Sequence, residues 1–249
     1  MLFVITLFFA TAFAETEAVE VRSNPTYETD SVVYAAGHRV RLRAEGDVAS
    51  NALAAIGLAD PLTVLGAGEA WVQVRTATGQ EGYVSRELLT PTVVLHDLDD
   101  DGFLDKIVAT LGAEGEVIIR TSVGEVTTRF RLETHSRSYV RLSVLDIWEA
   151  GVPMLKIETQ DRQACGDSQV RYFLSYQDDQ LRQAISEYES SDAPYYGYES
   201  VAFLPTSRTA VKTRASGDHY DDVHQVEVEI LKLEHGVYMS RSKASLDVE

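Results

Sequence analysis

The sequence is poor in cysteine and in positive charge, and each shortage excludes a class of protein. Its 249 residues include one cysteine, Cys165, so no disulfide can form within the chain and hydrophobic cores must hold the fold. Lysine and arginine number 22 against 39 aspartates and glutamates, a formal net charge of −17. Such a chain repels nucleic acids and anionic lipids and concentrates divalent cations. We therefore expect no nucleic-acid partner.

Long hydrophobic runs are also missing, with one exception at the N-terminus. Residues 2–13 form an apolar stretch that ends in Ala12-Phe13-Ala14, the small-x-small pattern of a secretory cleavage site. No lysine or arginine precedes this stretch, and it is shorter than the roughly 20 residues that span a bilayer. The pattern predicts a signal peptide at 1–14, export to the periplasm or the outside, and no membrane span after cleavage.

The strongest chemical signal is the acidic motif Asp-Leu-Asp-Asp-Asp-Gly-Phe-Leu-Asp at 97–105. Oxygen donors recur at every second residue of this motif, as a hard cation such as calcium requires. The candidate ligands are four carboxylates and one backbone carbonyl, from Asp97, Asp99, Asp101, Asp105 and Phe103. We expect a structural calcium site that stabilises the loop; the alternative is a solvated acidic turn.

The flanks of the motif indicate which kind of calcium loop it is. An EF-hand needs a glutamate at its twelfth position, where this chain has Val108. Short apolar runs, Val93-Val94-Leu95 and Ile107-Val108-Ala109, lie on either side and favour two strands joined by the loop. Residues 93–110 thus resemble the FG-GAP/VCBS type of repeat, in which such a loop joins two strands of a β-propeller blade.

Residues 31–92 contain several short strand-like segments separated by turn residues. The alternation of apolar residues in Val40-Arg41-Leu42-Arg43 and in Trp71-Val72-Gln73-Val74-Arg75 favours the half-buried strands of a small barrel. Together with Leu62-Thr63-Val64-Leu65 and Gly82-Tyr83-Val84, these segments resemble the bacterial SH3-like (SH3b) domain over about 31–90.

Two departures from the SH3b pattern are visible. Ala44-Glu45-Gly46-Asp47 replaces the Gly-Pro that commonly follows the first arginine, and the closing aromatic residue is Tyr83 instead of tryptophan. The resemblance implies a targeting module for a cell-wall glycan or peptide, or for an envelope protein. We expect its ligand surface at Trp71 and Tyr83.

The remaining segments complete an all-β prediction. Residues 15–30 are polar and acidic, with Pro25, and read as a linker. Residues 93–249 are rich in strand-like segments, and 142–151 align faintly with 93–102 at an offset of 49 residues. We expect an SH3-like barrel followed by a C-terminal β domain built as propeller-like blades, an open twisted sheet or a sandwich. The 157 residues of that domain correspond to about three blades, fewer than closed propellers have.

Catalytic motifs are absent from the sequence. There is no His-Glu-x-x-His zinc motif, and Cys165 lies in Gln-Ala-Cys-Gly-Asp, without the Asp-Cys-Ser-Gly of the NlpC-type peptidases that often accompany SH3-like modules. Segment 218–224 combines histidines with aspartates and reads best as a solvated loop, with a transition-metal site as the alternative. The tyrosine-rich segment 194–198 reads best as an amphipathic covering of a β core, with a sugar-stacking platform as the alternative.

The sequence therefore predicts an exported, non-catalytic binding or adaptor protein with calcium as a structural ion. The alternatives are a cell-wall hydrolase with an unrecognised active site and an envelope component that self-assembles. Nothing in the sequence sets the oligomeric state or the role of the single cysteine.

Overall fold

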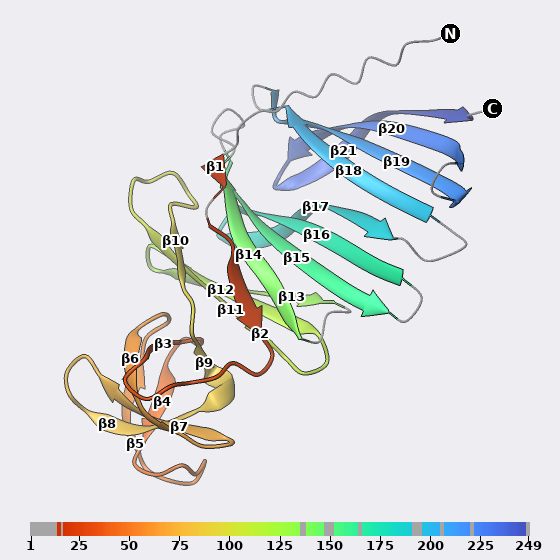
Figure 1. Ribbon diagram of the computed structural model, residues 1–249. Helices are drawn as coiled ribbons and strands as arrows, with labels where there is room; N and C mark the ends of the chain where they lie inside the picture. Colours follow the sequence, from red (N-terminus) through yellow and green to blue (C-terminus); the bar gives the residue numbers. More distant parts are fainter. Residues whose placement is uncertain are drawn as a thin grey trace.

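The computed structural model describes residues 14–15, 17–134, 138–146, 152–163, 166–190, 196–204, 207–219 and 222–247. The chain is nearly all β, with 68% of residues in strands and 2% in helix. The strands form three antiparallel sheets (Figure 1). This confirms the predicted all-β class. Within the described ranges, no helix has the length and apolar character needed to cross a membrane.

The first sheet has seven strands in the order β5-β4-β8-β7-β6-β3-β9 and forms the small barrel. Its strands are β3 (Val32–Ala35), β4 (Val40–Arg43), β5 (Ala52–Ile56), β6 (Pro61–Ala67), β7 (Trp71–Thr76), β8 (Glu81–Ser85) and β9 (Leu89–Thr90), with the short helix η1 (Arg86–Leu88) before β9. Alternate residues of each strand point inward, so Leu42, Val72 and Val74 are fully buried in one core. The alternation read from the sequence thus gives the barrel its inside and its outside.

The second sheet is a four-stranded meander that contains the acidic motif. Its strands are β10 (Val94–His96), β11 (Asp105–Leu111), β12 (Glu116–Val123) and β13 (Val126–Glu133). The motif joins β10 to β11, as expected, and Asp105 itself begins β11.

The third sheet is a long antiparallel meander. It runs in the order β1-β14-β15-β16-β17-β18-β19-β20-β21, and β2 also pairs with β14. Its strands are β1 (Ala14–Glu15), β2 (Val19–Arg22), β14 (Tyr139–Asp146), β15 (Met154–Gln163), β16 (Gly166–Gln177), β17 (Gln180–Ser190), β18 (Tyr196–Leu204), β19 (Thr209–His219), β20 (Asp222–Glu234) and β21 (Val237–Asp247).

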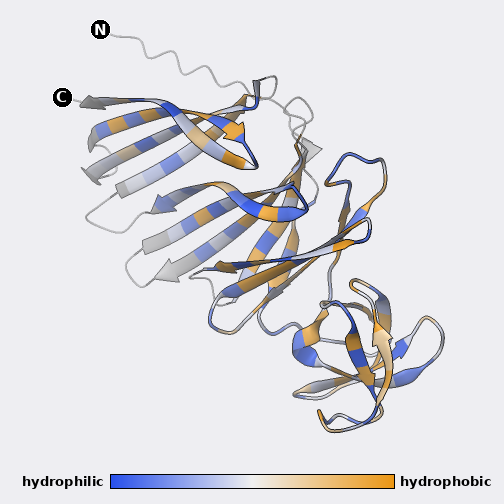
Figure 2. Ribbon diagram, turned by 180° about the vertical axis from the view of Figure 1, so that it is seen from behind, coloured by the Kyte–Doolittle hydropathy of each residue, from blue (hydrophilic) through white to orange (hydrophobic). Residues whose placement is uncertain are grey.

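The second and third sheets pack as layers. One face of β14–β16 buries Leu142 and Leu155 against Ile107 and Ile119 of the four-stranded sheet. Among the described residues, two pairs join β17 to β18, and beyond that point β18–β21 fold over the other face of the same sheet. Bands of polar and apolar residues alternate along these strands (Figure 2), as expected for sheets covered on one or both faces.

The second contact between layers is aromatic and apolar. Phe203 of β18 meets Phe173 of β16 with ring centroids 5.2 Å apart, and it meets Tyr238 of β21 at 5.7 Å. Neighbouring residues of one strand, such as Met154 and Leu155, therefore lie in different cores. Of the three predicted alternatives, the structure has the sandwich of packed sheets. The described residues do not form a ring of propeller blades.

The segment predicted as a linker, 15–30, is packed instead. Val19 to Arg22 pair with β14 as strand β2, and Val21 is buried in the core between the second and third sheets. Tyr27 is buried in the barrel core, where its hydroxyl donates to the Leu89 carbonyl at 2.9 Å. Two buried side chains in an acidic stretch give no periodic pattern that the sequence could reveal. In the structure, they connect the barrel to the large sheet.

Candidate metal loop and binding surfaces

The acidic loop brings three of the four predicted carboxylates together. One oxygen each from Asp97, Asp99 and Asp105 lies within 4.8 Å of the other two. Oxygens that bind one calcium ion at about 2.3–2.6 Å lie at most about 5 Å apart, so this group has the right size and the hard donors for calcium. Leu98, between two of the aspartates, is buried in the core and anchors the loop from beneath.

The loop backbone is held by its own carboxylates. Asp97 accepts hydrogen bonds from the amides of Asp101 (3.1 Å) and Gly102 (2.8 Å), and Asp105 accepts one from the Leu98 amide (2.8 Å). Asp100 and Gly102 have positive φ angles of 63° and 87°, a conformation that glycine adopts freely. These turns aim the carboxylates toward one another.

The two remaining predicted ligands lie differently. The carboxylate of Asp101 is outside the converging group and accepts a hydrogen bond from the Phe103 amide at 2.8 Å. The Phe103 side chain is 75% exposed. Ligand roles for Asp101 and for the Phe103 carbonyl stay predictions.

The electrostatics of the loop favour a cation. Burial raises the pKa of Asp99 above its ordinary value, and the charge of Asp101 raises it further. The pKa of Asp105 is raised mainly by burial, against the hydrogen bond from Leu98, with smaller contributions from Asp99 and the other loop carboxylates. Negative charge is therefore crowded where the three carboxylates meet.

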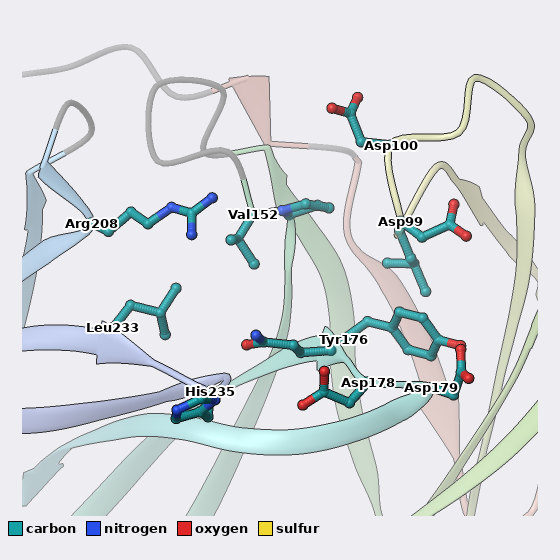
Figure 3. Close-up of a pocket in the computed structure, with 12 residues that line it drawn as sticks. Asp99, Asp100, Val152, Tyr176, Asp178, Asp179, Arg208, Leu233 and His235 are labelled. Carbon is teal, nitrogen blue, oxygen red and sulfur yellow. The ribbon is translucent and has the colours of Figure 1, made fainter.

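A cavity of about 350 Å³ adjoins this loop (Figure 3). Asp99 and Asp100 line it from the loop, and Tyr176, Arg208 and His235 line it from the large sheet. Burial and the nearby Asp179 raise the pKa of Tyr176 to about 12. The loop thus faces polar groups of a neighbouring layer that lie far away in sequence.

On the barrel, both predicted ligand-binding aromatics lie on the outer face of one hairpin. Val72 and Val84 point into the core from β7 and β8, so the alternating positions Trp71 and Tyr83 point outward and are half-buried. The Trp71 ring packs beside Gly46, where a Cβ would lie only 3.2 Å from it. Segment 44–47, which departs from the SH3b sequence pattern, thus has a glycine where a side chain would crowd the Trp71 ring.

The sequence of this barrel decides its family. Residues 38–90 match the family model of the bacterial SH3 domain. The bacterial SH3 domain, predicted for about 31–90, is thus confirmed over 38–90, whereas no finding supports an FG-GAP/VCBS repeat at 93–110, which stays a prediction. No curated protein and no solved structure matched the chain.

A groove of about 770 Å³ separates the bacterial SH3 domain from the four-stranded sheet. Trp71 and Arg86 line it from the domain, and Thr110, Glu116 and Arg120 line it from β11 and β12. The two bodies also touch directly, since Val108 of β11 packs against Leu58 and Ala59. Trp71 belongs to this groove, but Tyr83 is not among its lining residues.

An unusual pair of arginines lies on the sheet wall of this groove. Arg120 of β12 is directly opposite Arg129 of β13, so two like charges face each other across the strands. Burial lowers the pKa of Arg120, and the charge of Arg129 lowers it further. Among the described residues, no carboxylate forms an ion pair with either guanidinium, whereas the nearby Arg131 pairs with Glu116 at 2.9 Å.

A ladder of ion pairs crosses the inner face of the folded large sheet. It consists of two networks, Glu158–Arg171–Glu187 on β15 to β17 and Lys212–Glu199–Arg214–Glu227–Lys243 on β18 to β21. Arg171 contacts Glu158 at 3.2 Å and Glu187 at 2.7 Å, and Glu187 also accepts the Val201 amide at 2.7 Å. Sequence reasoning missed this ladder, because only alternating charges on separate strands could have signalled it.

Several sequence candidates lie outside the described residues. These are Cys165, Trp148 and Ala150 of the second repeat, most of the signal segment, and the side chains of 218–224. Met154, which follows the second copy of the faint repeat, is fully buried in the core.

Proposed function

We propose that the protein is an exported, non-catalytic adaptor that binds a cell-wall or envelope ligand through its bacterial SH3 domain. The observation that carries this proposal is the match of residues 38–90 to that family, together with two aromatic side chains on one outer face. Aromatic faces pack on the apolar faces of sugars and on peptide chains, so Trp71 and Tyr83 suit a wall glycan or peptide.

Calcium has a structural role in this proposal. An ion held by Asp97, Asp99 and Asp105 would neutralise three neighbouring carboxylates and fix the loop between β10 and β11. Because Leu98 anchors the same loop in the core, the ion would stabilise the packing of the second sheet on the third. It would supply no chemistry to a bound ligand.

Cosedimentation of the full chain with purified peptidoglycan sacculi tests the binding proposal. We expect the chain to pellet with sacculi and the variants Trp71→Ala and Tyr83→Ala to do so about tenfold more weakly, the effect of a truncated aromatic contact at an interface. Tyr188→Ala is the matched control, since Tyr188 is an exposed tyrosine of the large sheet, 40% accessible. Equal binding by all variants would contradict the assigned surface.

The same sacculi test the non-catalytic part. We expect no release of soluble fragments and no loss of turbidity over hours with excess protein, with and without calcium. Release of fragments that increases with protein concentration would favour the wall hydrolase instead.

A further inference from the structure

The groove between the bacterial SH3 domain and the four-stranded sheet has features that packing alone does not explain. It is the larger of the two cavities described above, about 770 Å³ against 350 Å³. One wall presents Trp71, and the other presents Arg120, a half-buried cation beside the like charge of Arg129. Like charges directly opposite on neighbouring strands destabilise a sheet.

A half-buried guanidinium that forms no ion pair can bind an anion. A guanidinium binds a carboxylate through two parallel N–H···O bonds, and the bond is strengthened where water is partly excluded. Within the part of the chain that the structure describes, the neighbouring carboxylate of Glu116 is already bound to Arg131. Glu116 thus offsets the charge of Arg120 without an ion pair between the two, and the Arg120 guanidinium keeps N–H donors for an anion that enters the groove.

The other charges of the groove limit what that anion can be. Glu69, Glu87 and Glu116 line the groove along with Arg22, Arg86 and Arg120, and the chain as a whole carries a net charge of −17. A polyanion would be repelled by this surface. A short ligand with free carboxylates and a free amine can place its carboxylates near the arginines of the groove and its amine near the glutamates.

We propose that this groove binds a zwitterionic peptide of the cell-wall type, with one of its free carboxylates on Arg120 and its body against Trp71. The inference rests on the proposed wall-binding function and deepens it, because it names the ligand class and adds a residue that lies outside the bacterial SH3 domain. The four-stranded sheet then forms one wall of the binding site. Segment 17–30, which packs on β14 and in the barrel core, holds the two walls of the groove together.

Calorimetric titration of the full chain tests the groove. The probes are a short synthetic wall-type peptide with one lysine amine and free carboxylates, and the same peptide with its carboxylates amidated. We expect the acid form to bind about tenfold to a hundredfold more tightly than the amide, the range for one hydrogen-bonded charge. In Arg120→Gln this preference disappears, and in Arg120→Lys part of it returns. Arg75→Gln is the matched control, since Arg75 is paired with Glu81 on the exposed surface of the domain.

Loss of folding can be separated from loss of binding. Removing one of two opposed charges should leave the thermal midpoint of Arg120→Gln equal to or above that of the wild type. Tight binding of the acid form by Arg120→Gln would overturn the inference, and so would displacement of the peptide by stoichiometric inorganic polyphosphate.

The two proposals fail in different ways. If the wild type pellets with sacculi but binds neither peptide, the groove inference is wrong and the proposed function stands. If it binds the acid peptide and not the sacculi, the groove stands and wall binding is wrong. If it binds neither, both are wrong.

Discussion

We expect calcium to stabilise this protein, because the carboxylates of Asp97, Asp99 and Asp105 repel one another when no cation is bound. An ion that binds only the folded state at a hundred times its dissociation constant adds about 2.7 kcal/mol to the free energy of unfolding. For a chain of 249 residues this raises the thermal midpoint by roughly 5–10 °C. The comparison is thermal unfolding, followed by circular dichroism, in millimolar calcium and in excess chelator.

Asp99→Asn should reverse its effect between these two conditions. Without calcium, the wild-type loop holds three carboxylates within 4.8 Å, and two unit charges at that spacing repel by about 1 kcal/mol in water. Removing the Asp99 charge therefore leaves the chelated protein equally stable or slightly more stable. With calcium present, the same variant loses a ligand and most of the roughly 2.7 kcal/mol.

Asp100→Asn is the control for charge alone. Asp100 is exposed, adjacent in sequence and outside the converging group, so its variant should keep the full calcium response. Asp101→Asn then reports whether that residue is a ligand. A wild-type midpoint that ignores calcium, or equal behaviour of Asp99→Asn and Asp100→Asn, would refute the reasoning.

Three further predictions concern stability. Arg120→Gln relieves repulsion from Arg129 and should raise the free energy of unfolding in urea by about 0.2–1 kcal/mol; a decrease would show that Arg120 is paired within the fold. Burial raises the pKa of Tyr27 from 10.0 to about 12, so the unfolded chain ionises first and stability should fall as pH rises from 10 to 12. Tyr27→Phe should cost about 1 kcal/mol at neutral pH and flatten that alkaline decline in urea titrations at pH 8 and 11; an unchanged decline would exclude Tyr27 as its source. Glu187→Gln removes one of the two carboxylate partners of Arg171, whose side chain is 31% exposed and keeps Glu158. It should lower the free energy of unfolding by about 2 kcal/mol, less than the roughly 3–5 kcal/mol for breaking a fully buried pair, and a urea midpoint within error of wild type would show that this ion pair is energetically neutral.

The sequence by itself predicted what depends on local spacing. Alternation at every second residue identified the strands of the barrel, because a strand turns successive side chains to opposite faces. The same alternation explains why Trp71 and Tyr83, which were chosen from the resemblance to the SH3b domain, lie outside the core. Oxygen donors at every second residue of 97–105 predicted the acidic loop. Each of these features extends over fewer than about ten residues, the reach of a single strand or turn.

Tertiary structure alone decided which distant segments meet. The opposition of Arg120 and Arg129 depends on the register of β12 and β13, and the ion-pair ladder depends on seven strands aligned in order. A shift of one residue in either register would turn these charges to the other face. Residues 17–30 have the composition of a linker but are packed, because β2 pairs with β14 and because Val21 and Tyr27 are each buried in a core formed by other segments. Whether a short segment packs is decided by the residues that surround its side chains, and for Val21 and Tyr27 these residues are distant in sequence.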